Sequence, residues 1–168
     1  LINFIISKGY NFSDIAKKDK SIKANKLSTI TMYYLAGMTF IVKSTNDYQK
    51  KRENIHETFV GLNSINNLLK LIPNFSYIFG MYEEEDKLCV ITEYIYGKTF
   101  FEYIESSEFN FTIYLKIIIQ LCLAIEVAQK NCGLVHWDLT PWNIMLISLE
   151  KEIEIDYVLE YNQIYRIK

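Results

Sequence analysis

The feature that most constrains the fold is a polar loop that lies between two apolar runs in the C-terminal third of the sequence. The apolar runs are residues 134–135 and 144–147, and the loop between them, residues 136–143, contains a proline. Apolar runs separated by a polar segment of this kind predict a strand, a loop and a second strand. The loop carries one imidazole, one carboxylate and one carboxamide, which belong to His136, Asp138 and Asn143.

The loop resembles the catalytic loop of the protein kinase superfamily, H-R-D-L-x-x-x-N. The resemblance implies that Asp138 orients and deprotonates an acceptor hydroxyl, and that Asn143 binds Mg²⁺. Phosphoryl transfer depends mostly on positioning and on neutralising the charge of the phosphoryl oxygens. A carboxamide oxygen suits this task, because Mg²⁺ prefers hard oxygen ligands. His136 is expected to brace the loop rather than to react.

Two segments near the N-terminus predict a β-hairpin. Residues 29–34 and 38–45 are rich in β-branched and aromatic residues, and Ala36-Gly37 lies between them. Lys43 follows Phe40-Ile41-Val42, which resembles the third N-lobe strand of kinases. In that family the lysine of this strand pairs with the α- and β-phosphates of ATP.

The next segment predicts an amphipathic helix from Lys50 to Ile72, which Pro73 ends. Its apolar positions recur at a spacing of three to four residues and include Ile55, Phe59, Leu62, Leu69 and Ile72. The resemblance implies that a glutamate of this helix pairs with Lys43. Glu57 is the expected partner, and Glu53, one turn earlier, is the alternative.

Residues 76–82 and 88–92 predict two further strands, joined by an acidic turn that we expect to be solvated. Residues 90–100 resemble the kinase hinge. In that family, main-chain groups bind the adenine edge, here those of Glu93 and Ile95. The resemblance also makes Thr92 the gatekeeper at the back of the nucleotide pocket. Recognition by the backbone lets the side chains vary.

Residues 111–132 predict a long helix with a broad buried face that is ended by Gly133 as a C-cap glycine. The face comprises Leu115, Ile118, Ile119, Cys122, Leu123 and Ile125. Charged and polar residues interrupt the run, so we expect a core helix rather than a membrane span. The three cysteines form no C-x-x-C pair and are expected to be buried free thiols of a reducing compartment.

Three features depart from the kinase pattern. Gly9 and Gly37 are the only glycines in the first 60 residues, and neither begins the Gly-rich loop that covers phosphates. Trp137 replaces the arginine that commonly receives an activation-loop phosphate, so activity should not need that phosphorylation. Thr140 stands where many serine/threonine kinases carry a lysine, which leaves the γ-phosphate with less charge compensation.

The magnesium-binding D-F-G segment has two candidate positions. Asp156-Tyr157-Val158 lies at a suitable separation from Asn143, but valine replaces the glycine. Residues 153–158 and 163–167 also predict an inserted hairpin, which we favour because valine does not adopt glycine-type backbone freely. The metal-binding aspartate would then follow Lys168.

The order of these segments predicts a kinase-like α+β fold. A β-rich N-lobe with one helix should span about residues 29–92, a hinge about 93–97, and the start of a helical C-lobe 98–168. The sequence leaves the structure of residues 1–28 unclear. The chain starts with Leu and lacks an A-P-E segment, so a truncated kinase domain is the simplest description. The HWDLTPWNIM string, with the high Ile, Asn, Lys and Tyr content, is similar to kinase-like proteins of large DNA viruses.

The expected function is phosphoryl transfer from ATP, with Mg²⁺, to a serine or threonine of a protein. Two alternatives remain: a small-molecule kinase of the aminoglycoside or choline type, and a catalytically inactive binding module. A net charge of −2 at pH 7 gives no indication of a nucleic-acid or membrane partner. We expect an intracellular, cytoplasmic protein, located in the host cytoplasm if it is viral.

Overall fold

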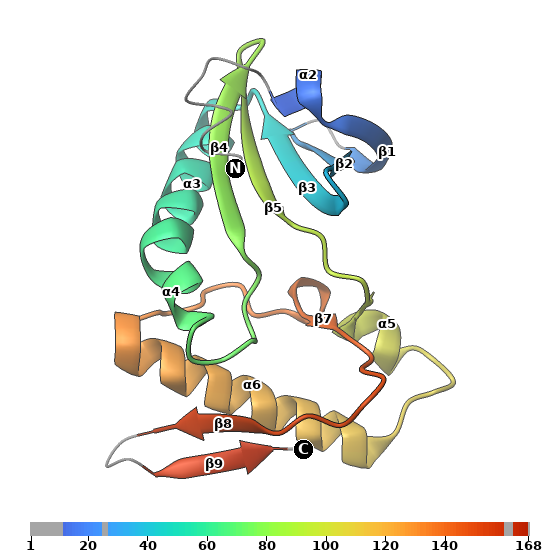
Figure 1. The fold of residues 1–168 in the computed structure, drawn as a ribbon, viewed down its shortest axis with the longest axis vertical. Helices are drawn as coiled ribbons and strands as arrows, with labels where there is room; N and C mark the ends of the chain where they lie inside the picture. Colours follow the sequence, from blue (N-terminus) through green and yellow to red (C-terminus); the bar gives the residue numbers. More distant parts are fainter. Residues whose placement is uncertain (1–11, 25–26, 160–162, 168) are drawn as a thin grey trace. The chain divides into compact units, whose positions relative to one another are not determined.

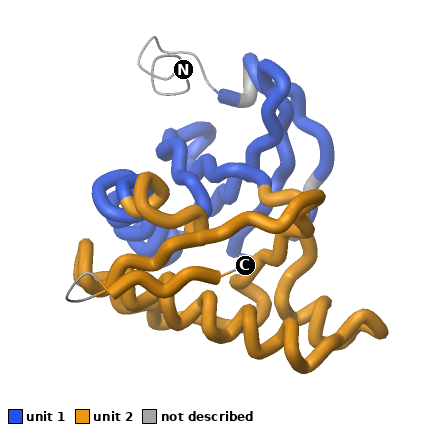
Figure 2. Tube along the Cα trace, turned by 60° about the horizontal axis from the view of Figure 1, so that its bottom comes forward, with its two compact units in different colours: residues 1–67, 76–94 blue, residues 68–75, 95–168 orange. Residues whose placement is uncertain are grey.

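The computed structural model describes residues 12–24, 27–159 and 163–167. The chain divides into two compact units (Figure 2), of which unit 1 comprises residues 1–67 and 76–94 and unit 2 comprises residues 68–75 and 95–168. Residues 68–75 therefore group with the second unit, although the sequence analysis assigned them to the N-lobe. Each unit has its own cluster of buried side chains.

Unit 1 is built on a five-stranded antiparallel sheet with the strand order β1-β2-β3-β5-β4 (Figure 1). The strands are β1 Lys17–Ala24, β2 Thr29–Leu35, β3 Met38–Thr45, β4 Ile78–Glu84 and β5 Lys87–Glu93. Both predicted hairpins form, β2 with β3 and β4 with β5. Strand β4 begins and ends two residues later than predicted, so the acidic turn narrows to Glu85 and Asp86.

Strand β1 lies within residues 1–28, whose structure the sequence left unclear. Its side chains at Lys17, Lys18 and Lys20 are exposed, and β1 forms one edge of the sheet. Lysines on an edge strand oppose pairing with another chain, because that pairing would bring their charges together. Residues 1–11 and 25–26 of that segment lie outside the described residues.

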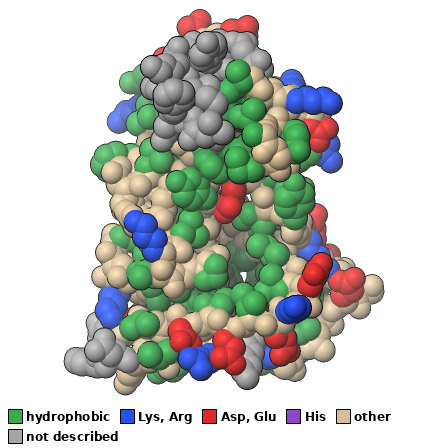
Figure 3. All heavy atoms as spheres, viewed as in Figure 1, with side chains coloured by type: hydrophobic (Ala, Val, Ile, Leu, Met, Phe, Trp, Pro, Cys, Tyr) green, Lys and Arg blue, Asp and Glu red, His purple; other side chains and the backbone are tan. Residues whose placement is uncertain are grey.

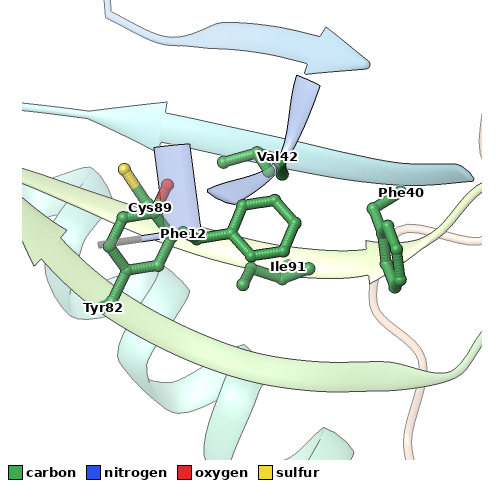
Figure 4. Close-up of a cluster of buried hydrophobic side chains, with 7 residues drawn as sticks. Phe12, Phe40, Val42, Tyr82, Cys89 and Ile91 are labelled. Atoms are coloured by element: carbon green, nitrogen blue, oxygen red, sulfur yellow. The ribbon is translucent and has the colours of Figure 1, made fainter. Parts of the chain in front are cut away.

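The core of unit 1 lies on one face of this sheet and includes an aromatic side chain from a short helix. Phe12 of α2 (Phe12–Ile15) is fully buried against Phe40, and the two ring centroids are 5.7 Å apart in an edge-to-face arrangement. Figure 4 shows Phe12 over the strands, together with Val42, Tyr82, Cys89 and Ile91. Burial raises the pKa of the Cys89 thiol to about 11.

The other helical part of unit 1 consists of α3 (Tyr48–Val60), η1 (Gly61–Ile65) and α4 (Asn66–Leu68), whose last residue groups with unit 2. The helix lies beside β4 (Figure 1). The predicted apolar face is wrong in part, because Ile55, Phe59 and Leu62 are exposed. The buried positions are instead Asn54, Thr58 and Gly61.

A close approach at Gly61 explains why α3 buries its small and polar side. A Cβ atom at position 61 would overlap the side chain of Ile78 on β4, so only glycine fits there without a shift of that side chain. The Thr58 hydroxyl donates to the Asn54 carbonyl over 2.8 Å, which satisfies one buried polar group within the helix. Packing space, and not hydrophobicity, therefore decides which side of α3 faces the sheet.

Unit 2 contains the long predicted helix and several short elements. They are β6 Lys98–Thr99, α5 Phe100–Ile104, α6 Phe111–Cys132, η2 Pro141–Asn143, β7 Met145–Leu146, β8 Ile155–Val158 and β9 Ile164–Ile167. The side chain of Asn110 caps the start of α6 by accepting from two main-chain N–H groups. The predicted C-cap is confirmed, because Gly133 ends α6 in the left-handed conformation with φ 65°.

The burial of α6 differs from the prediction. Its fully buried positions are Ala124, Val127 and Ala128, whereas Leu115, Ile119 and Cys122 of the expected face are exposed. Figure 3 shows hydrophobic side chains exposed over much of the visible face of the molecule. By length and composition α6 could cross a membrane, with a mean hydropathy of 1.9, and 17% of that window is buried.

The core of unit 2 joins α6 to the hairpin of β8 and β9. Tyr157 of β8 is fully buried with Ile72, Ala124 and Val127. Its hydroxyl donates to Asn74 Oδ1 over 2.9 Å, so the buried polar end has a partner. The free thiols differ from the expectation of three buried ones, because only Cys89 is buried, Cys122 is exposed and Cys132 is intermediate.

Gly97 gives a direct test of the packing between β6 and β7. A Cβ atom at this position would overlap the carbonyl oxygen of Leu146, which is backbone and cannot rotate away. We therefore expect Gly97→Ala to lower the free energy of unfolding by about 1–3 kcal/mol, the usual cost of overpacking. Urea unfolding followed by circular dichroism measures this loss, and an unchanged midpoint would contradict the close approach.

Candidate active site

Lys43 occupies a face of the sheet that is set by strand alternation. Phe40 and Val42 point into the aromatic core, so Lys43, one residue further, points to the opposite face, where α3 lies. Its Nζ lies 3.2 Å from Glu57 Oε2 on α3. The two side chains are 37% and 63% exposed, so water screens the pair.

The structure pairs Lys43 with Glu57 and not with Glu53, which had been the alternative. Glu53 Oε2 instead lies 2.6 Å from Lys50 Nζ, within the same helix. The register of α3 is set by Asp47, whose side chain accepts from the main-chain N–H of Lys50 over 2.9 Å. The sequence analysis missed Asp47, although an aspartate directly before a helix is a usual N-cap signal.

Thr92 lies on the same face of the sheet as Lys43. Ile41 pairs with Thr92 and Lys43 pairs with Val90 in the register between β3 and β5. Because side chains alternate along each strand, Lys43 and Thr92 are diagonal neighbours on one face, about 7–8 Å apart at this spacing. A nucleotide that contacts Lys43 can therefore reach Thr92.

The expected hinge comprises about residues 93–97, and its two expected adenine contacts are the main chains of Glu93 and Ile95. The main-chain N–H of Glu93 donates to the Tyr77 carbonyl over 3.0 Å, and the Glu93 carboxylate accepts from the Tyr77 N–H over 2.8 Å. Of the main-chain groups of Glu93, the carbonyl is therefore the one that can serve an adenine. Ile95 belongs to unit 2, so the boundary between the two units falls inside the expected hinge.

The loop of residues 136–143 is held together by its own hydrogen bonds. The side-chain amide of Asn143 donates to the Asp138 carboxylate over 2.9 Å and to the Asp138 carbonyl over 3.0 Å. The main-chain N–H of Asn143 donates to the Thr140 carbonyl over 2.9 Å, which closes the turn. The Asp138 N–H donates to His136 Nδ1 over 3.3 Å, which places His136 in the bracing position expected for it.

Two neighbouring elements of unit 2 hold the exit of this loop. The N–H of Phe100, at the start of α5, donates to the Ile144 carbonyl over 2.8 Å. Strand β6 pairs with β7, which follows the loop directly. Helix α5 begins with a capping box in which Thr99 and Glu102 bind each other's main-chain N–H groups. The loop is thus anchored to a capped helix.

The donor set of this loop fits a magnesium ion only in part. Both hydrogen bonds of the Asn143 side chain use its nitrogen, so the carboxamide oxygen is left as an available hard ligand beside the Asp138 carboxylate. Within residues 12–24, 27–159 and 163–167, no group of three or more His, Cys, Asp or Glu side chains could hold a metal. A further carboxylate would have to complete the site.

Asp156 lies in strand β8 of the hairpin that the sequence analysis favoured. Strands β8 and β9 are antiparallel, and Asp156 pairs with Arg166 across them. Arg166 donates to both carboxylate oxygens of Asp156, over 2.6 and 2.9 Å, and these bonds lower the pKa of the Asp156 carboxyl. Asp156 is therefore engaged by a bidentate arginine, in a strand rather than in a metal-binding loop.

A contact that the sequence analysis missed is an aromatic stack beside the loop. The rings of Trp142 in η2 and Phe101 in α5 are stacked, with centroids 3.5 Å apart and an angle of 27° between their planes. No local sequence signal indicates this pair, because its members belong to different elements. The stack adds a second link between the loop and α5.

A loop with a paired Asp and Asn, and a strand lysine paired with a helix glutamate, define the protein-kinase class. The family of protein tyrosine and serine/threonine kinases matches residues 20–159, and the chain belongs to this family. The expected kinase-like α+β fold is confirmed by solved structures. The kinase domain of PF14_0431 has a TM-score of 0.66 at 20% identity, over 95% of this chain and 48% of that domain. Rad53 in complex with AMP-PNP has a TM-score of 0.63 at 17% identity, over 85% of this chain and 38% of Rad53.

The expected similarity to viral kinase-like proteins is also confirmed. Uncharacterized protein 179R of Invertebrate iridescent virus 6 is 38% identical over 162 residues, which are 89% of this chain and 14% of 179R. Probable kinase 098L of Invertebrate iridescent virus 3 is 25% identical over 77% of this chain and 24% of 098L. The chain thus spans a seventh to a quarter of the length of these relatives.

The exposure of the Lys43–Glu57 pair predicts a small effect on stability. Exposed ion pairs contribute at most about 1 kcal/mol, so we expect Glu57→Gln to change the free energy of unfolding by less than that. Glu53→Gln is the matched control, because Glu53 forms an exposed pair on the same helix. Urea titrations of both variants test this, and a loss above about 2 kcal/mol in Glu57→Gln alone would indicate a structural rather than a ligand-directed role.

Proposed function

We propose that this protein transfers the γ-phosphoryl group of ATP to the hydroxyl of a protein serine or threonine, with Mg²⁺ as cofactor. The observation that carries the proposal is the loop of unit 2, in which Asn143 holds the carboxylate of Asp138 in place. A carboxylate fixed in this way can receive a proton without first having to be oriented, which is the advantage of preorganised catalysis.

The residues of the chain would divide the work as follows. Asp138 accepts a hydrogen bond from the acceptor hydroxyl and takes its proton as the oxygen attacks the γ-phosphorus. The bond between the γ-phosphorus and its bridging oxygen breaks, and ADP leaves. Lys43, held by Glu57, contacts the nucleotide phosphates, and Asn143 offers its carboxamide oxygen to Mg²⁺. Bound Mg²⁺ supplies neutralisation of phosphate charge.

Different observations support the proposal of ATP as the nucleotide and the proposal of a protein as the phosphoryl acceptor. The main-chain carbonyl of Glu93 and the main chain of Ile95 are the proposed adenine contacts, with Thr92 at the back of the pocket. Rad53, which shares the fold, was crystallised with AMP-PNP. The matching family acts on protein tyrosine, serine and threonine by its description, which favours a protein over a small-molecule acceptor. Since the viral relatives point to a virus, we propose the host cytoplasm as the place of action.

Replacing the proposed base tests the function directly. In the full-length protein, we expect Asp138→Asn to lower the transfer of γ-phosphate from ATP to a generic protein substrate by about 10²–10⁴-fold. The asparagine keeps the size of the side chain but cannot take the proton. Radiolabelled ATP measures the transfer, and Asp156→Asn is the matched control, which should retain activity.

The outcomes of this assay separate the candidate functions. Equal transfer by Asp138→Asn and the unchanged protein would contradict the assignment of the base. Transfer to an aminoglycoside or choline, but not to protein, would favour the small-molecule kinase. No transfer by a folded protein would favour a binding module.

The binding module has one specific observation in its favour. Residues 25–28, between the first and second strands, read Asn-Lys-Leu-Ser and contain no glycine. The phosphate-covering loop of kinases needs glycine because its backbone approaches the phosphates closely. A thermal-shift titration with ATP and Mg²⁺ separates the two functions, since a ligand stabilises the protein by RT ln(1 + [L]/Kd). An absent shift at millimolar ATP would favour the module.

A further inference from the structure

The candidate catalytic loop carries both tryptophans of the chain, and both are exposed. Trp137, directly before Asp138, is 92% exposed, and Trp142, directly before Asn143, is 58% exposed. Large aromatic side chains normally bury most of their surface, and exposed ones with a fixed geometry are frequent at binding sites. Two of them beside the proposed base therefore need an explanation in terms of a ligand.

Trp142 is held in a defined position. Its ring is stacked on Phe101 at a centroid distance of 3.5 Å, and its backbone belongs to the short helix η2. The next residue, Asn143, is hydrogen-bonded to Asp138. Trp142 is therefore bonded directly to the residue that holds the Asp138 carboxylate, and consecutive Cα atoms are only about 3.8 Å apart. The Trp142–Phe101 pair is a preorganised aromatic platform.

The chain segment around Trp142 carries almost no charge, and the nearby Lys98 and Glu102 are already engaged by Glu108 and Thr99. From Gly133 to Leu149, Asp138 is the only Asp, Glu, Lys or Arg. Exposed apolar side chains on the same stretch, beyond the two tryptophans, are Val135, Leu139, Met145, Ile147 and Leu149. The stretch thus offers no cation to anchor an acidic substrate. Its one carboxylate is the proposed base, which must stay available to the acceptor hydroxyl.

We propose that the acceptor segment docks through an aromatic or aliphatic side chain next to its hydroxyl residue, and that Trp142 on Phe101 is the platform for that side chain. Trp137, which directly precedes Asp138 in the sequence, adds a second exposed aromatic side chain beside the proposed base. The inference rests on the proposed function and adds the substrate class to it: hydroxyl residues with apolar rather than charged neighbours. An aromatic contact of this kind changes affinity by up to about tenfold.

A pair of matched peptides tests the platform in the full-length protein. The peptides share one serine and differ in the adjacent residues, which are Phe in the first peptide and Lys or Asp in the others. We expect a KM for the Phe peptide about tenfold below that of the charged peptides. Trp142→Ala should remove this difference, mainly through KM, and Trp142→Phe should restore most of it.

Phe111→Ala is the matched control for the loss of an exposed aromatic side chain. Phe111 is 64% exposed at the start of α6, outside the loop and its platform, and its ring stacks on Tyr114. The peptide preference should be the same in this variant as in the unchanged protein. Loss of the preference in both variants would indicate a general effect of surface hydrophobicity and would overturn the proposal.

Binding without turnover separates this proposal from the proposed function. Fluorescence polarisation of labelled peptides with alanine in place of the serine reports binding even if no phosphate is transferred. Preference for the Phe peptide that depends on Trp142, without any transfer, would support the platform and contradict the kinase activity. Transfer that depends on Asp138 but shows no peptide preference would overturn the platform alone. Equal binding of all peptides, as expected if another part of the protein covers the tryptophans, would also overturn it.

Discussion

The alternation of side chains along β3 is the constraint on which unit 1 depends. Phe40 and Val42 fill the core around Phe12, and the same pleat forces Lys43 to the opposite face. A shift of one residue would place the lysine in an aromatic cluster and expose the core. Burial of these apolar side chains therefore stabilises the sheet. Because side chains alternate along the strand, it also makes the Lys43 side chain point toward α3. The register of β3 therefore determines both the packing of the core around Phe12 and the direction of Lys43, the proposed nucleotide contact.

In unit 2 the corresponding role belongs to hydrogen bonds rather than to burial. The loop around Asp138 is exposed, so it gains little from the hydrophobic effect. Its shape comes instead from the bonds of Asn143, from the Phe100 N–H and from the stack of Trp142 on Phe101. A loop fixed in this way can keep its polar and aromatic groups at the surface, where a substrate can reach them. The same two aromatic positions that brace the loop can also select what docks beside it.

Much of the fold followed from local patterns. The hairpins, the long helix and its end at Gly133 were predicted because strand propensity, turn residues and a C-cap glycine act over a few neighbouring residues. The side of α3 that carries Ile55 and Phe59 was predicted to be buried because of its apolar spacing, but it is exposed. A close contact between Gly61 and Ile78 placed the smaller side against the sheet instead. Strand β1 was not predicted because its several lysines have a low strand propensity. Lysines are tolerated there because β1 is an edge strand.

The sequence by itself determined the chemistry that is present: an Asp and an Asn five positions apart in one loop, a lysine at the end of a strand, and two tryptophans in the loop. Tertiary structure alone decided which groups meet. Lys43 pairs with Glu57, whereas Glu53 pairs with Lys50. Arg166 binds the Asp156 carboxylate, and Trp142 stacks on Phe101. The physical reason is that composition and spacing fix the faces of each element. Pairing across elements depends on helix register and strand register, which only the packed chain sets.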